Sequence, residues 1–190
     1  MAVARQTMTA DEYLALPPTD QNRRLELIDG ELVVNEPKLG HQQVVLRLAH
    51  QIMTWIDGGS GRGNVFMPDV YLTDRDVFSP DVVWVGPGYR YPEDDGALRD
   101  PPELVIEVRS PSTWRHDRGR KRDLYEAAGV VELWLVDHLS GTVEVHRRSS
   151  PGAPGFDERH VLHAGDTLTT PLLPGLVLDL AALFARGTGA

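Results

Sequence analysis

The chain has 190 residues, of which 41% are hydrophobic and 25% are charged, and it contains no cysteine. This length is typical of one domain with a sizeable core, and the lack of cysteine excludes disulfides and thiolate chemistry. The net charge of −9 argues against a general polyanion-binding surface, so any nucleic-acid contact must come from a local basic patch. No run of residues approaches the roughly 20 apolar positions of a membrane span. We therefore expect a cytoplasmic protein with no membrane partner.

The chain divides into three expected parts, and its N-terminal third contains two short sequence motifs. We expect residues 1–8 to form a flexible leader, residues 9–185 to form the folded domain and residues 186–190 to form a C-terminal tail. Thr9 and Glu12 form a capping box that opens a short helix. Further on, residues 24–34 predict a β-hairpin, because Asp-Gly at its centre suits a type I′ turn.

The rest of the chain alternates between helical and strand patterns. Helical spacing of apolar residues predicts a helix over 41–57, and charged and apolar patterning predicts others over 116–128 and 180–185. Apolar runs predict the strands, which are 64–73, 81–85, 104–108, 131–137, 142–147 and 156–163. Residues 86–102 are rich in Gly, Pro and Asp and predict a surface loop. Without repeats or a linker, this order favours a single α/β domain.

Two acids interrupt the apolar runs. Asp81 opens the sequence Asp-Val-Val-Trp-Val, and Glu107 lies within Leu-Val-Ile-Glu-Val. A carboxylate is costly to bury, and two of them brought together on adjacent strands need a cation. Asp81 and Glu107 are therefore candidate ligands for a hard divalent metal, most naturally Mg²⁺, and the backbone carbonyl of Val108 is a candidate third oxygen ligand. Arg109 should share a face with Glu107, because strand side chains alternate.

An ordered series of segments carries a family resemblance. The segments are Leu25–Glu31, Ser79-Pro80-Asp81, Leu104–Thr113 and Lys121–Asp137. Here the chain resembles the PD-(D/E)XK nuclease superfamily and, more narrowly, the "putative restriction endonuclease" domain family of the Uma type. The likeness extends over about residues 9–185. It implies a restriction-endonuclease-like mixed β-sheet flanked by helices, with an N-terminal β-hairpin.

The resemblance also implies an activity and roles for individual residues. The expected protein is an endonuclease that hydrolyses phosphodiester bonds of DNA with Mg²⁺, for which Mn²⁺ is expected to substitute. Asp81 and Glu107 match the family's metal ligands, and Glu26 matches an upstream acid that can complete the site. The motif lysine is replaced by Arg109, so the resemblance assigns the catalytic role to Lys121 of the following helix, with Arg109 as the alternative cation.

Further candidates surround these residues. His41 could act as a second-shell or proton-transfer partner. Phosphate contacts are expected from the basic residues near the second acid, which are Arg109, Arg115, Arg118, Arg120 and Arg122. Each assignment has a simpler alternative: a turn residue at Asp81, a plain ion pair at Glu107, a solvent-facing strand residue at Glu26, a surface His41 and a solvated basic helix face.

Two other functions fit the same residues. The chain could be a catalytically inactive nucleic-acid- or protein-binding module on a nuclease scaffold, since position 109 is Arg and the net charge is acidic. It could also be another carboxylate hydrolase such as a glycosidase, although the basic segment has no evident use there. For a nuclease that cuts both strands, a homodimer is expected because two sites are needed.

Overall fold

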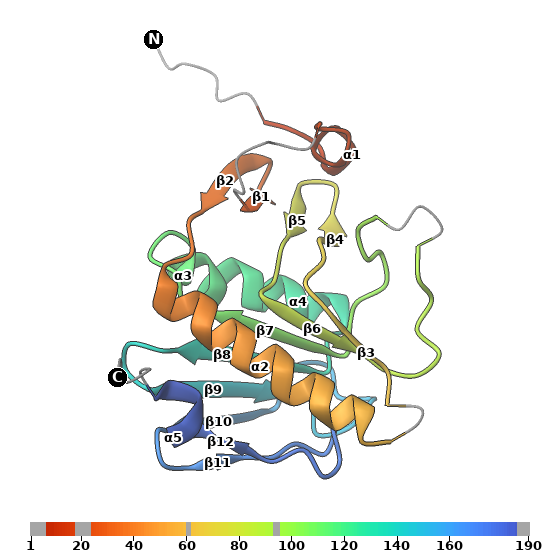
Figure 1. Cartoon of the computed structure of the whole chain (residues 1–190). Helices are drawn as coiled ribbons and strands as arrows, with labels where there is room; N and C mark the ends of the chain where they lie inside the picture. The colour runs from red at the N-terminus through yellow and green to blue at the C-terminus, as the bar shows by residue number, and fades with distance from the viewer. Residues whose placement is uncertain (1–6, 18–23, 60–61, 93–95, 186–190) are drawn as a thin grey trace.

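The computed structural model describes residues 7–17, 24–59, 62–92 and 96–185. Residues 1–6 of the expected leader and the expected tail at 186–190 lie outside the described residues. The folded part is built on a six-stranded sheet in the order β10-β9-β8-β7-β6-β3 (Figure 1). Its strands are β3 (Asn64–Phe66), β6 (Val82–Val85), β7 (Leu104–Val108), β8 (Glu132–Asp137), β9 (Thr142–Arg147) and β10 (Glu158–His163).

The sheet is mixed because one neighbouring pair runs in the same direction. β7 and β8 are parallel, joined by a helical crossover, whereas all other adjacent pairs in this sheet are antiparallel. The predicted mixed sheet flanked by helices is confirmed. None of the helices among the described residues is long and apolar enough to cross a membrane.

The two faces of the sheet are both buried, which explains why its central strands are continuously apolar. Val82, Trp84 and Ile106 pack toward α2 (Leu39–Asp57), and the other face packs toward α4 (Arg122–Ala128). Figure 1 shows α2 crossing the first face with α5 (Leu180–Phe184) beside it, and α4 on the far side. Below α2, β11 (Thr167–Leu168) pairs with β12 (Leu178–Asp179).

A smaller sheet holds the predicted N-terminal hairpin. Its order is β2-β1-β5-β4, with β1 (Arg24–Ile28), β2 (Glu31–Asn35), β4 (Val70–Thr73) and β5 (Asp76–Phe78). Asp29 and Gly30 both have positive φ, at 53° and 77°, so the type I′ turn is confirmed. The capping box at Thr9 also forms and begins α1 (Ala10–Leu14).

Two predictions of secondary structure were wrong, and the short strands β5, β11 and β12 were not predicted. The single strand expected over 64–73 is divided into β3 and β4, which belong to different sheets, because Pro68 lies between them and has no N–H to donate. β5 was not predicted, because a three-residue strand carries too short a pattern. The helix expected over 116–128 is instead α3 (Trp114–His116), a kinked turn η1 (Asp117–Lys121) and α4, and Gly119 has non-helical angles at the kink.

Candidate active site

The register of β6 and β7 brings the two predicted acids together. Val82 pairs with Ile106 and Val83 with Val105, so the same register continued by one step sets Asp81 opposite Glu107. Directly opposed residues on antiparallel strands have Cβ atoms about 4.5–5.5 Å apart. The exposed fractions are only 2% for Asp81 and 3% for Glu107. Both acids therefore lie in the interior, at one end of β6 and β7, which are inner strands of the large sheet.

Lys121 supplies the cation for this acidic cluster. Its Nζ donates to Glu26 Oε1 at 2.6 Å and to Glu107 Oε1 at 3.2 Å, and it lies 3.0 Å from Asp117 Oδ1. The kink at Gly119 belongs to the turn that carries both Asp117 and Lys121 into the interior. The structure thus brings Lys121, rather than Arg109, to Glu107.

Asp81 is oriented by two donors from different elements. Its Oδ2 accepts a 2.8 Å hydrogen bond from the backbone N–H of Val108 and lies 3.0 Å from Nε2 of His41, near the start of α2. His41 is buried, and its Nδ1 has no hydrogen-bond partner. The structure therefore places His41 in direct contact with Asp81, as a second-shell partner would be.

Glu26 and Glu107 are oriented in the same way. Besides Lys121, Glu26 Oε1 accepts from the backbone N–H of Ser79 at 3.0 Å, and Glu107 Oε1 accepts from the Tyr125 hydroxyl at 2.8 Å. In each acid, as in Asp81, one oxygen is thus held by two donors. The carboxylate planes are fixed by this anchoring rather than left to rotate.

The charges of the cluster do not balance. Three buried carboxylates, those of Glu26, Glu107 and Asp117, share one lysine, and a fourth, Asp81, is buried beside Val108. Burial raises the pKa of Glu107 well above its usual range; Lys121 opposes this shift, whereas the neighbouring carboxylates add to it. Burial likewise raises the pKa of Glu26. The carboxylates overcome the burial cost at the ammonium and raise the pKa of Lys121 well above normal. A further positive charge would therefore stabilise this region.

The donor set fits a hard divalent cation. Glu26 Oε2 is buried without a hydrogen-bond partner, and the available ligands are carboxylate and backbone oxygens. Among the described residues, no three His, Asp or Glu side chains form a ready-made metal cage. Mg²⁺ is commonly held by one or two carboxylates together with waters and substrate phosphates, and Asp81 and Glu107 are ligands of that kind. Asp81 and Glu107 are the residues that would hold it, and the Val108 carbonyl remains a predicted ligand.

The predicted phosphate-binding arginines are mostly paired with acids. Arg109 Nη1 donates to Asp137 at 2.8 Å, and Arg120 makes a two-point contact with buried Asp76, at 2.8 and 2.7 Å. Arg118 lies 3.8 Å from Glu144, Arg122 pairs with Asp123, and Arg115 is exposed. These pairs reduce the net positive charge that the segment presents.

Sequence reasoning missed three members of the site. Asp117 and Tyr125 were not singled out, although Asp117, Lys121 and Tyr125 recur at intervals of four residues, the spacing of one helix face. Ser79 acts through its backbone N–H, which no side-chain pattern can reveal. The four-residue interval was therefore the one available signal.

The fold and the cluster together define a restriction-endonuclease-like α/β protein. The chain belongs to the Uma2 family, described as "Putative restriction endonuclease", whose model matches residues 10–181. A solved structure with a similar fold is that of a "putative nuclease belonging to DUF820" from Anabaena variabilis, with a TM-score of 0.76 and 22% identity over 93% of this chain and 97% of the other. No curated protein matches the chain.

Proposed function

We propose that the protein is an Mg²⁺-dependent endonuclease that hydrolyses phosphodiester bonds of DNA. The observation that carries this proposal is that Asp81 accepts a hydrogen bond from the backbone N–H of Val108, the residue after Glu107, while Lys121 donates to Glu107. Two oriented carboxylates beside a buried ammonium are the groups that phosphodiester hydrolysis needs. Membership of the Uma2 family supports nuclease chemistry.

Each residue has a defined part in the proposed reaction. The metal, when bound, lowers the pKa of the attacking water and neutralises charge on the phosphate. Asp81 and Glu107 would hold it, and Glu26 extends the acidic surface. Lys121 acts as a positioned point charge that holds the attacking water or a phosphate oxygen. Its pKa is raised well above normal, so it stays protonated at neutral pH and acts as a charge rather than a base.

Arg109 is assigned a different role. Its guanidinium is paired with Asp137, and it is always protonated in proteins. It therefore cannot accept a proton from water. Its side chain is about one third exposed, so it is available for a two-point contact with a phosphate next to the cleaved one.

The test compares the wild type with Asp81→Asn, a substitution that keeps the size of the side chain. Cleavage of supercoiled plasmid is followed with Mg²⁺ and with Mn²⁺, and folding is checked by thermal melting. We expect Asp81→Asn to abolish cleavage, while the control Asp123→Asn, at an exposed acid of α4, cleaves normally. The proposal fails if folded wild type and Asp81→Asn are equally inert with both metals on DNA and RNA.

A second candidate is a non-catalytic nucleic-acid- or protein-binding module. One observation favours it: Lys121 already has three carboxylate partners, so the cluster has an internal cation. This candidate predicts no metal at the acids. A calorimetric titration with Mn²⁺ separates the two, because binding that Glu107→Gln abolishes would count against the inactive module.

We also propose a homodimer, because cleavage of both DNA strands usually uses two sites related by a twofold axis. The exposed surface of α2 supports this, since Leu39, Leu46 and Met53 are 84%, 64% and 50% exposed and lie seven residues apart. Light scattering across a concentration series measures the mass directly. A monomer at all concentrations, with and without DNA, would contradict the dimer.

A further inference from the structure

The phosphate-binding surface expected from the sequence is largely neutralised by acids, whereas a second basic region lies at the start of α2. A cavity of about 500 Å³ lies between the N-terminal half of α2, the turn after β8 and α5. Its lining includes Lys38, Gln43, Arg47 and His138 and, among the described residues, no Asp or Glu. In a chain with a net charge of −9, such a lining is a marked local departure.

The cations of this cavity are held in place by the fold. Arg47 Nη1 donates to the carbonyls of Ala182, Leu183 and Ala185, which fixes its guanidinium at the end of α5. Lys38 is exposed at the start of α2, with no side-chain cap and no acid in the first helical turn. The positive end of this 19-residue helix therefore adds to the positive charge of Lys38 and Arg47.

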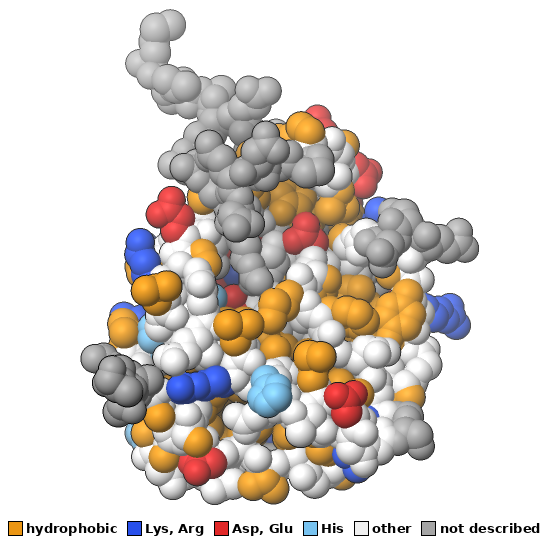
Figure 2. All heavy atoms as spheres, in the orientation of Figure 1, with side chains coloured by type: hydrophobic (Ala, Val, Ile, Leu, Met, Phe, Trp, Pro, Cys, Tyr) orange, Lys and Arg blue, Asp and Glu red, His pale blue; other side chains and the backbone are white. Residues whose placement is uncertain are grey.

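The cavity and the acidic cluster are linked by two neighbouring residues at the start of α2. Gly40 lies in its lining, packed so that an added Cβ would be 3.2 Å from Cδ2 of His138. The next residue, His41, contacts Asp81. Figure 2 shows basic side chains on the left of this face, beside the N-terminal part of α2 and α5. The cavity lining therefore lies one residue along α2 from His41, the side chain that contacts Asp81.

We propose that this cavity binds backbone phosphates of the DNA strand on one side of the scissile bond, with Lys38 and His138 as the contacting side chains. The inference rests on the proposed function and adds the path of the substrate. Charge complementarity and nearness to the acids support it, and exposed Leu139 in the lining offers an apolar contact for a sugar.

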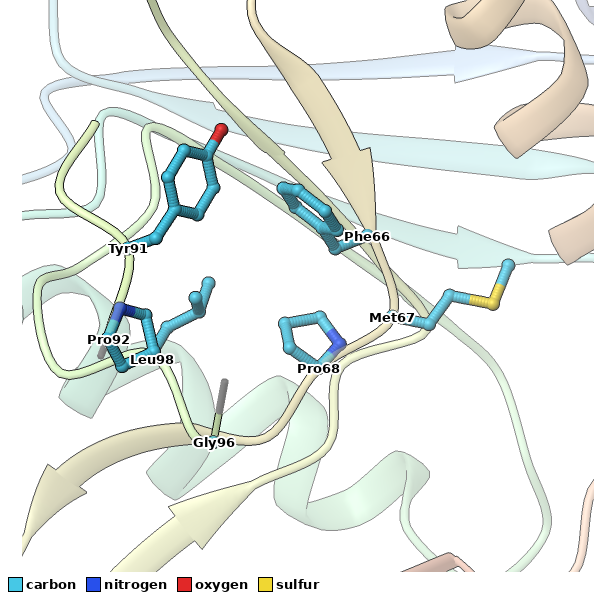
Figure 3. Close-up of a pocket in the computed structure, with 7 residues that line it drawn as sticks. All are labelled: Phe66, Met67, Pro68, Tyr91, Pro92, Gly96 and Leu98. Carbon is cyan, nitrogen blue, oxygen red and sulfur yellow. The ribbon is translucent and has the colours of Figure 1, made fainter. Parts of the chain in front are cut away.

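A second cavity provides the contrast. It has a volume of about 220 Å³ and lies beside β3 (Figure 3), where it is lined by Phe66, Met67, Pro68, Tyr91, Pro92, Gly96 and Leu98. No charged side chain lines it among the described residues. It therefore lacks the chemistry for a phosphate, and exposed Arg90 in the adjacent loop serves as a control position.

The experiment measures binding of a fluorescein-labelled 20-base-pair duplex by anisotropy, in EDTA so that cleavage is suppressed. Three exposed cations are reversed one at a time, as Lys38→Glu, Arg115→Glu and Arg90→Glu. We expect Lys38→Glu to weaken binding at least tenfold and to reduce the slope of log K against log salt by about 1, as loss of one phosphate contact does. His138→Ala should weaken binding in the same direction, and Arg90→Glu should change it less than twofold.

The outcomes separate this inference from the proposed function. If Lys38→Glu binds within twofold of the wild type while Asp81→Asn still abolishes cleavage, the inference is wrong and the nuclease stands. A larger loss for Arg115→Glu than for Lys38→Glu would likewise overturn it. A tenfold loss at Lys38 supports the inference even in a protein that cleaves nothing.

Discussion

Replacing Lys121 by methionine tests whether one ammonium holds the acidic cluster together. Methionine has nearly the same length but no charge, so Glu26, Glu107 and Asp117 lose their shared cation without a large change in volume. All of these side chains are at most 4% exposed, and the three contacts of Nζ are 2.6 to 3.2 Å long. The charge is therefore lost in the interior, where solvent screens the remaining carboxylates only weakly.

The size of the effect follows from this burial. Removing one partner of a buried ion pair costs about 3–5 kcal/mol, because an uncompensated charge stays inside. Small domains are stable by only about 5–15 kcal/mol, so the variant should unfold at much lower urea. Urea unfolding followed by circular dichroism at pH 8 and pH 5 gives the free energies. The difference in unfolding free energy between wild type and Lys121→Met should be smaller at pH 5 than at pH 8, because buried carboxylates without a cation take up protons.

A double variant distinguishes the loss of the charge at Lys121 from a general loss of packing. Glu26→Gln removes one of the buried carboxylates that the Lys121→Met variant leaves without a cation. The combination of Lys121→Met with Glu26→Gln should therefore be more stable than Lys121→Met alone. If Lys121→Met lowered the unfolding free energy by less than about 1 kcal/mol, equally at both pH values, the electrostatic reasoning would be refuted, because a loss that small is typical of solvent-exposed ion pairs. Strict additivity in the double variant would refute it too.

Further predictions concern the groups that orient the acids. The raised pKa of Glu107 means that the folded state holds this proton more tightly than the unfolded state, so the contribution to stability is present at low pH and is lost as pH rises above about 4.3. Glu107→Gln should therefore flatten the decline of the unfolding free energy with pH, measured by urea titrations from pH 4 to 8. An unchanged dependence of that free energy on pH would contradict the prediction. Tyr125→Phe removes a buried hydrogen bond to a carboxylate and should cost roughly 1.5–3 kcal/mol in urea unfolding, whereas a cost near zero would mean that Lys121 alone fixes the acid. His41→Phe should weaken Mn²⁺ binding about 10- to 100-fold by calorimetry, because Asp81 loses an orienting donor, and an equal effect of His50→Phe on the exposed side of the same helix would argue against this role.

The parts of the fold that were predictable have strong local signals. The Asp29-Gly30 turn, the capping box at Thr9 and the periodic apolar face of α2 each depend on residues close in sequence. Pro68 is a local signal for the break within residues 64–73, but which sheet each half joins was not predictable, because the partners of β3 and β4 lie elsewhere in the chain.

The same distinction applies to the site. Asp81 and Glu107 could be singled out because acids within apolar strands are costly and therefore conspicuous. The choice of Lys121 over Arg109 beside Glu107 depends on the kink at Gly119, which a helical pattern does not predict. Ionic pairing of the basic segment also came from distant acids, as in the contact of Arg120 with Asp76, 44 positions away.

The pairing of β6 with β7 has a consequence for engineering the protein. The separation of Asp81 and Glu107 is set by strand register, so it does not depend on the length of the connection between Val85 and Leu104. Lengthening a surface loop costs little entropy, so a peptide inserted at the exposed turn around Gly88 should leave the two acids in place. A single residue inserted within β6 would instead turn its side chains to the opposite face of the sheet. We therefore expect the chain to tolerate new sequence in the connection that follows β6 and to resist it within β6 itself.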